Sequence, residues 1–95
     1  MENMIGELKL QLMGYFGGGV REDEEVIAEL SEDMKGYPGT ARAFREGIAQ
    51  ALADPAADCV DLVERGANRA MEGSDEKARR WLAHLRSRLF PGEAA

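Results

Sequence analysis

Apolar residues recur at intervals of three and four in five segments of the chain, and this spacing predicts five helices. The predicted helices span roughly residues 2–16, 22–35, 40–53, 55–70 and 75–90. No segment alternates apolar and polar residues over the length of a strand, so no sheet is expected. The pattern therefore predicts an all-α fold, a compact single-domain bundle of about five helices over residues 1–90, followed by a disordered tail at 91–95.

Each predicted helix has an apolar face that the other helices would bury. The predicted core residues are Ile5, Leu8, Leu12, Tyr15, Val26, Ile27, Leu30, Met34, Ala41, Phe44, Ile48, Ala51, Leu52, Cys59, Val60, Val63, Ala67, Ala78, Trp81, Leu82, Leu85 and Leu89. Met4 and Phe16 flank the first of these faces. Leu10 points away from the apolar face of its helix, and the pattern offers it no place in the core.

Glycines and prolines predict where these helices end. The run Gly17–Gly19 ends the first helix, because three glycines lose too much backbone entropy to remain helical. Gly36 suits a left-handed C-cap of the second helix, and Pro38 prevents that helix from continuing. Gly66 and Pro91 are expected near the ends of the fourth and fifth helices. The predicted N-caps are Thr40, Asp54 (followed by Pro55 at the first helical position) and Ser74.

The charge of the chain narrows the possible partners. Its 95 residues carry a net charge of −6, and the sequence pI is about 4.8. Nucleic-acid binding requires clustered Lys and Arg to neutralise phosphates, so no nucleic-acid partner is expected. Cys59 is the only cysteine, which excludes an internal disulfide and indicates a reducing compartment. The charged N-terminal segment resembles neither a signal peptide nor a membrane span, so we expect a cytoplasmic protein without a membrane partner.

Residues capable of catalysis or metal binding do not form a familiar pattern. The glycines at 17–19 lack the Lys-Ser/Thr that follows a phosphate-binding loop, and acidic residues come after them. The acidic run at 22–25 lacks the ligand spacing of a calcium-binding EF-hand. His84 is the only histidine, which excludes the paired Glu-x-x-His motifs of di-metal bundles. We therefore expect no catalytic residue, no metal and no cofactor, and hence a protein that is not an enzyme.

Acidic residues recur at spacings of three and four along one side of the second predicted helix. Like charges at these spacings destabilise a helix, and those near its C-terminus also oppose the helix dipole. Such a face fits a partner-binding surface, and it equally fits a surface that serves only solubility. The candidate partner-binding residues are Glu22, Glu25, Glu29, Glu32 and Asp33, with Tyr37 as a possible aromatic anchor. The basic flank of the last helix, Lys77, Arg80, His84 and Arg88, is a second candidate.

Four segments of the chain, taken together, resemble a known family. They are LMGYFGGG, EDEEVIAEL, FREGIAQALAD and SDEKARRWLAHLRSRLF. In that order they resemble the small helical immunity proteins of bacterial contact-dependent growth inhibition systems. Relatives tend to carry a polar stretch with His and Asp where this chain has Gly17–Gly19.

The resemblance implies a cytoplasmic antitoxin that acts by binding. Members of the family bind the C-terminal toxin domain that a neighbouring cell delivers, and many of these toxins are nucleases with basic clefts. An acidic surface could face such a cleft by charge complementarity. The alternative is a non-enzymatic helical adaptor or oligomerisation module of a larger complex, and a bundle that binds a small molecule or metal is the weakest hypothesis.

Overall fold

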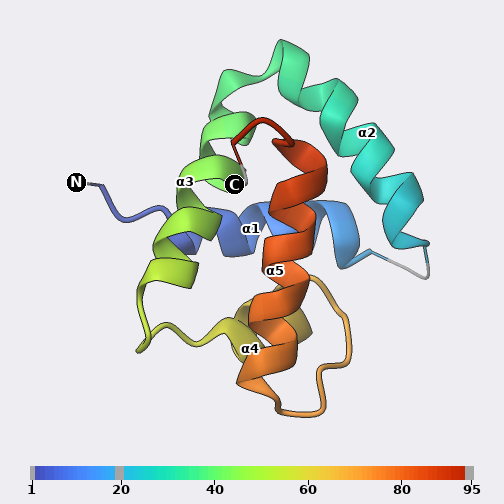
Figure 1. Ribbon diagram of the computed structural model, residues 1–95. Coiled ribbons are helices and arrows are strands. Elements are labelled where there is room, and N and C mark those ends of the chain that lie inside the picture. Colours follow the sequence, from blue (N-terminus) through green and yellow to red (C-terminus); the bar gives the residue numbers. More distant parts are fainter. Residues whose placement is uncertain (1, 19–20, 94–95) are drawn as a thin grey trace.

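A computed structural model describes residues 2–18 and 21–93 of the protein (Figure 1). Its elements are α1 (Ile5–Phe16), α2 (Asp23–Gly36), α3 (Pro38–Ala53), α4 (Cys59–Asp61), the π-helical turn η1 (Leu62–Gly66) and α5 (Asp75–Leu89). None of the described residues lies in a strand. The fold is therefore a compact all-α bundle, as the apolar spacing predicts.

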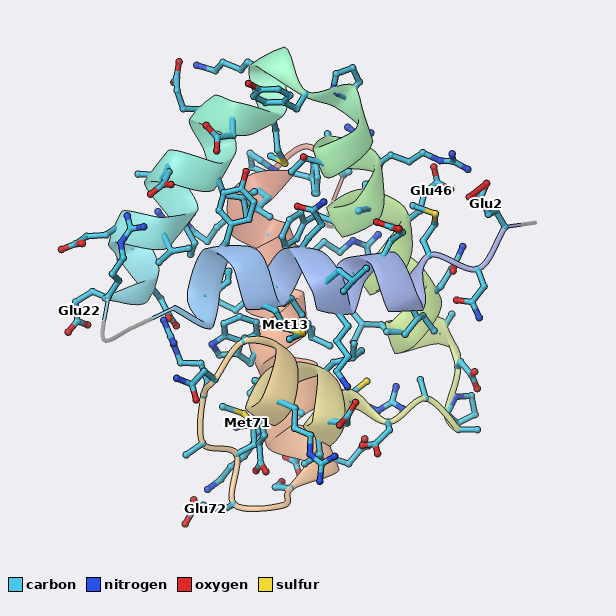
Figure 2. All side chains as sticks on the ribbon, turned by 180° about the vertical axis from the view of Figure 1, so that it is seen from behind. Glu2, Met13, Glu22, Glu46, Met71 and Glu72 are labelled. Carbon is cyan, nitrogen blue, oxygen red and sulfur yellow. The ribbon has the colours of Figure 1, made fainter. Side chains whose placement is uncertain are left out.

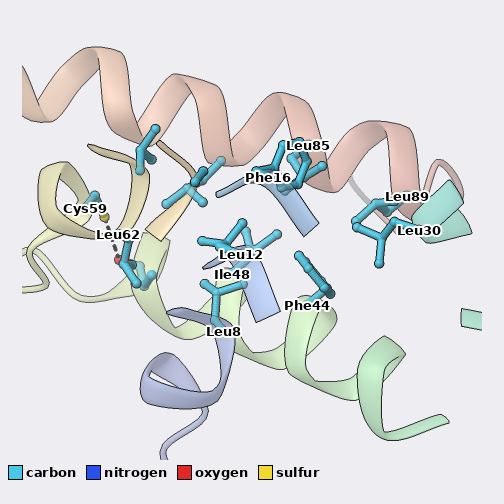
Figure 3. Packing of buried hydrophobic residues seen from close by; sticks show 14 of the residues in the cluster. Leu8, Leu12, Phe16, Leu30, Phe44, Ile48, Cys59, Leu62, Leu85 and Leu89 are labelled. Atoms are coloured by element: carbon cyan, nitrogen blue, oxygen red, sulfur yellow. Dashed lines mark hydrogen bonds between the residues drawn. The ribbon is translucent and has the colours of Figure 1, made fainter. Parts of the chain in front are cut away.

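Helix α1 lies at the centre of the packing. It contacts α2, α3 and η1, while α5 crosses in front of it in the view of Figure 1. The fully buried side chains meet between these helices, as Figure 3 shows for 14 members of the core cluster. The largest are Phe16, Phe44, Leu8, Leu12, Leu30, Ile48, Leu82, Leu85, Val26, Val63 and Cys59. Phe16 lies edge-on to the half-buried ring of Trp81, with the ring centres 5.2 Å apart.

Helices α1 and α3 approach each other most closely at Gly47. An added Cβ at this glycine would lie 2.7 Å from the Cβ of Leu8 and 3.0 Å from the carbonyl oxygen of Met4. The absence of a side chain therefore sets the distance between the two helices. Gly14 lies on the side of α1 that faces solvent. An added Cβ there would meet nothing within 4 Å, so its lack of a side chain serves no helix contact.

The turn between α2 and α3 is tighter than the sequence predicts. Gly36 is the last residue of α2 and does not adopt a left-handed conformation, so the predicted C-cap is wrong. Tyr37 alone separates the helices, and Pro38 begins α3, so Thr40 is not the N-cap. Pro38 ends one helix and starts the next because proline lacks an N–H group but has a backbone angle suited to the first helical position.

The fourth helix is shorter than the predicted segment 55–70. Residues 54–58 form a turn, and Asp58 rather than Asp54 caps α4 by accepting a 3.0 Å hydrogen bond from the N–H of Asp61. The carbonyls of Asp54 and Ala57 accept hydrogen bonds from Arg79 of α5, at 3.0 and 3.2 Å. A guanidinium group thus stabilises the turn in place of a helical first turn. Gly66 is the last residue of η1, as expected.

The two ends of the described chain also differ from the prediction. Helix α1 starts at Ile5 rather than near residue 2, because the N–H of Met4 donates to Gln50 Oε1 at 2.7 Å. Pro91–Glu93 form a turn rather than a loose tail, and Glu93 pairs with Arg45 at 2.9 Å. Residues 94–95 of that predicted tail lie outside the described residues, as does Gly19 of the glycine run at 17–19. Ser74 caps α5 as predicted, accepting from the N–H of Lys77 at 3.1 Å.

The contrast between Phe16 and the glycines after it predicts two unequal substitutions. Phe16→Ala should lower the free energy of unfolding by about 3 kcal/mol or more, because it empties a buried aromatic site. Gly18→Ala should change that free energy by no more than about 1 kcal/mol, because its φ is not positive and an added Cβ meets nothing within 4 Å. Urea denaturation measures both, and equal effects would contradict the placement of Phe16 in the core.

Substitution by alanine should change the free energy of unfolding in opposite directions at Gly47 of α3 and at Gly14 of α1. Gly47→Ala should destabilise the protein by about 1–3 kcal/mol, because Leu8 and the backbone of Met4 have no room for the methyl group. Gly14→Ala, the matched control, should stabilise it by up to about 1 kcal/mol through helix propensity alone. Thermal and urea unfolding test the pair, and a stabilising Gly47→Ala would show that α1 and α3 separate easily.

Candidate partner-binding surface

Helix α2 holds the predicted acidic residues on its outer side. Val26, Ile27 and Leu30 are buried on the inner side of the helix, which fixes its orientation. Among the predicted acidic residues, those with exposed side chains are Glu22, Glu25, Glu29 and Glu32, and we call these four the acidic ridge. The structure thus brings these four predicted residues onto one exposed face, on a helix that packing holds in place.

Nearby cations pair with part of the acidic ridge. Arg21 lies 3.8 Å from Glu25 and 2.6 Å from Glu29, and Lys35 lies 3.2 Å from Glu32. Glu22 makes no ion pair within residues 2–18 and 21–93. Exposed pairs of this kind contribute little to stability, because water and salt screen them. The carboxylates therefore remain accessible to the cations of another molecule.

Asp33 and Tyr37 are placed differently from the ridge. Asp33 is half-buried and accepts a 2.7 Å hydrogen bond from the hydroxyl group of Tyr15 on α1. Its carboxylate thus joins α2 to α1 instead of facing solvent alone. Tyr37 is 65% exposed in the turn after α2, where an aromatic side chain is free to contact a partner.

The environment of Tyr15 disfavours its ionised form. Burial, the hydrogen bond to Asp33 and the nearby charges of Asp33 and Glu29 together raise the pKa of this hydroxyl to about 12, and burial contributes most. The ring also packs edge-on against Phe44, with the centres 6.1 Å apart. Tyr15 is therefore a neutral donor that fixes the contact between α1 and α2.

Asp23, which is not among the predicted partner-binding residues, fixes the start of α2. Its two carboxylate oxygens accept hydrogen bonds from Arg69 Nε at 2.7 Å and from Trp81 Nε1 at 3.1 Å. Arg69 also donates to the carbonyls of Phe16 at 3.4 Å and Arg21 at 3.0 Å. No local pattern could have separated Asp23 from its acidic neighbours, because its partners lie 46 and 58 residues away.

The basic flank of α5 is largely engaged within the protein. Ion pairs join Lys77 to Glu72, Arg80 to Glu76 and Arg88 to Glu24. The hydrogen bond from Arg88 lowers the pKa of the Glu24 carboxyl group. His84 is exposed, at an open pocket of about 480 Å³ that Met71 and Trp81 also line. The flank therefore offers less unpaired positive charge than its sequence indicates.

The part of the chain that the structure describes holds neither a metal-binding cluster nor a membrane-spanning helix. Among residues 2–18 and 21–93, no three Asp, Glu, His or Cys side chains are grouped as a metal site would require. In the same part of the chain, every helix is too short or too polar to cross a membrane. Comparisons with protein-family models, with curated proteins and with solved structures found no match to this chain.

The raised pKa of Tyr15 predicts a loss of stability at high pH. The folded state binds the hydroxyl proton more tightly than the unfolded chain, so this contribution is complete below about pH 10 and decreases as the pH rises towards 12. In a Tyr37→Phe background, where Tyr15 is the only tyrosine, absorbance titration should give a pKa of about 12. Asp33→Asn should lower that value, and an unchanged titration would contradict the role of Asp33.

Proposed function

We propose that this protein is an immunity protein of a contact-dependent growth inhibition system, which binds and neutralises the toxin domain of its cognate effector. The observation that supports this most is the acidic ridge, which is exposed along a helix whose other side is buried. The resemblance of four segments, spread over nearly the whole chain, supports it independently. Neutralisation by binding requires a complementary surface, and it requires no catalytic group.

The geometry of the ridge suits a basic partner. Residues three or four apart on a helix lie about 5–6 Å from each other, so Glu22, Glu25, Glu29 and Glu32 form a continuous row of negative charge. A toxin that acts on a nucleic acid needs a positively charged cleft for its phosphates. The ridge would attract such a cleft over a long distance and then cover it, or cover a surface beside it.

An adaptor or oligomerisation module is the second candidate function. The exposed side chains of Tyr37, and of Leu10 and Met13 on α1, could equally form the contact surface of such a module. The two functions differ in what accompanies the gene. A large secreted toxin gene directly upstream favours the immunity protein, whereas genes for the subunits of a cytoplasmic complex favour the adaptor.

Reversing charges on the ridge should impair protection. Glu25→Lys with Glu29→Lys should slow association with the toxin domain encoded by the neighbouring gene by tenfold or more at low salt, because it removes electrostatic steering. Cells that rely on the double variant should lose protection. Stopped-flow mixing gives the association rate, and circular dichroism checks that the helices remain.

The matched control is Glu72→Lys with Glu76→Lys, which changes the net charge equally at exposed positions in the loop after η1 and on α5. Glu76 pairs with Arg80 much as Glu29 pairs with Arg21, so the control also loses an exposed ion pair. If the ridge variant associates at the wild-type rate and still protects cells, the ridge serves only solubility. A wild-type protein that forms no complex with the toxin domain would refute the proposed function itself.

A further inference from the structure

We infer that the outer face of α1 is the apolar centre of the partner-binding surface, and that it receives an apolar anchor of a basic partner whose cations meet the acidic ridge. The inference rests on the proposed function for the identity of that partner, the toxin domain. The residues that form this apolar face are Leu10 and Met13, together with the bare helix backbone at Gly14.

Leu10 and Met13 have no role in the core. Their exposed fractions are 62% and 48%, and within residues 2–18 and 21–93 the only other large apolar residue that is exposed is Tyr37. They are three residues apart and so share one side of α1, opposite the buried Leu8 and Leu12. Adjacent exposed apolar side chains are more typical of a binding surface than single, scattered ones.

The helix backbone beside these residues is open to an approaching partner. An added Cβ at Gly6 or at Gly14 would meet nothing within 4 Å. Figure 2 shows α1 crossing the face of the molecule with no other helix in front of it. A partner side chain can therefore lie directly on the backbone at Gly14, next to Leu10, and exclude water from both.

Polar contacts border the apolar face on two sides. Towards α2, Tyr15, which follows Gly14 in the chain, donates its hydrogen bond to Asp33 and so joins α1 to the helix that carries the acidic ridge. Towards η1, Lys9 and Asp61 form an ion pair at 2.7 Å. An apolar centre inside a polar border is the arrangement in which a few residues dominate binding, because the border keeps water out.

The negative charge of the protein determines which molecule can bind at the apolar face of α1. A second copy of this chain would bring another molecule of net charge −6, with its own ridge, against the same face. Like charges placed opposite each other disfavour that contact. A partner with an apolar side chain surrounded by Lys or Arg satisfies both the apolar centre and the ridge.

Two variants of the α1 face test this inference against the purified toxin domain. Leu10→Ser with Met13→Ser removes the apolar contact, and Gly14→Gln places a neutral side chain over the open backbone. All three positions are exposed, so both variants should fold. Each should weaken binding by tenfold or more, mainly through faster dissociation, because apolar anchors act on the bound state whereas charges act on encounter.

Ala83→Gln is the matched control, since it adds the same side chain at an exposed position of α5, outside α1 and α2. It should bind as the wild type does. Wild-type affinity in both α1 variants would overturn the inference and leave the proposed function intact. A wild-type dimer, seen by light scattering, that becomes monomeric in the Leu10/Met13 variant would overturn it in favour of self-association. A wild type that forms no complex with the toxin domain would refute the proposed function and this inference together.

Discussion

The carboxylate of Asp23 connects three segments that are far apart in the sequence. It accepts one hydrogen bond from Arg69 in the loop after η1 and another from Trp81 in α5, while it belongs to the first turn of α2. Arg69 extends the connection to α1, since its guanidinium lies 5.3 Å from the centre of the Phe16 ring and binds the Phe16 carbonyl. The direction in which α2 leaves α1 therefore depends on the half-buried carboxylate of Asp23. Its hydrogen bond with the Arg69 guanidinium is charge-assisted and hence stronger than one between neutral groups.

The position of α2 determines the character of the surface. Because Asp23 holds its start and the Tyr15–Asp33 hydrogen bond holds its last turns, the acidic ridge is presented on a rigid support next to α1. Because the backbone that carries these charges is already ordered, binding a partner costs only the rotamer entropy of the side chains, which favours affinity. The exposed Leu10 and Met13 belong to α1, the helix that the Tyr15–Asp33 hydrogen bond joins to this support.

The segment from the end of α3 to the start of α5 is stabilised by side-chain hydrogen bonds to its backbone more than by regular helix. Arg79 donates to four carbonyls at the end of α3 and in the following turn, those of Ala51, Leu52, Asp54 and Ala57. Glu64 of η1 accepts from the N–H groups of Met71 and Gly73, in a loop where Asn68 and Glu72 have positive φ angles. Such strained residues persist only where surrounding contacts hold them. This part of the chain is therefore built from specific polar contacts, which short-range patterns do not reveal.

The sequence by itself determined the helices α1, α2, α3 and α5, most of the buried faces and the Ser74 cap, because helix periodicity and capping depend on residues within a few positions of each other. It also determined that Leu10 has no place in the core. Only the tertiary structure decided that the fourth helix starts at Cys59, since a guanidinium from α5 binds the preceding turn, and that Leu62 enters the core through the π-helical turn. It likewise decided that Asp23 is structural while its neighbours face solvent, because the groups that bind Asp23 come from the other half of the chain.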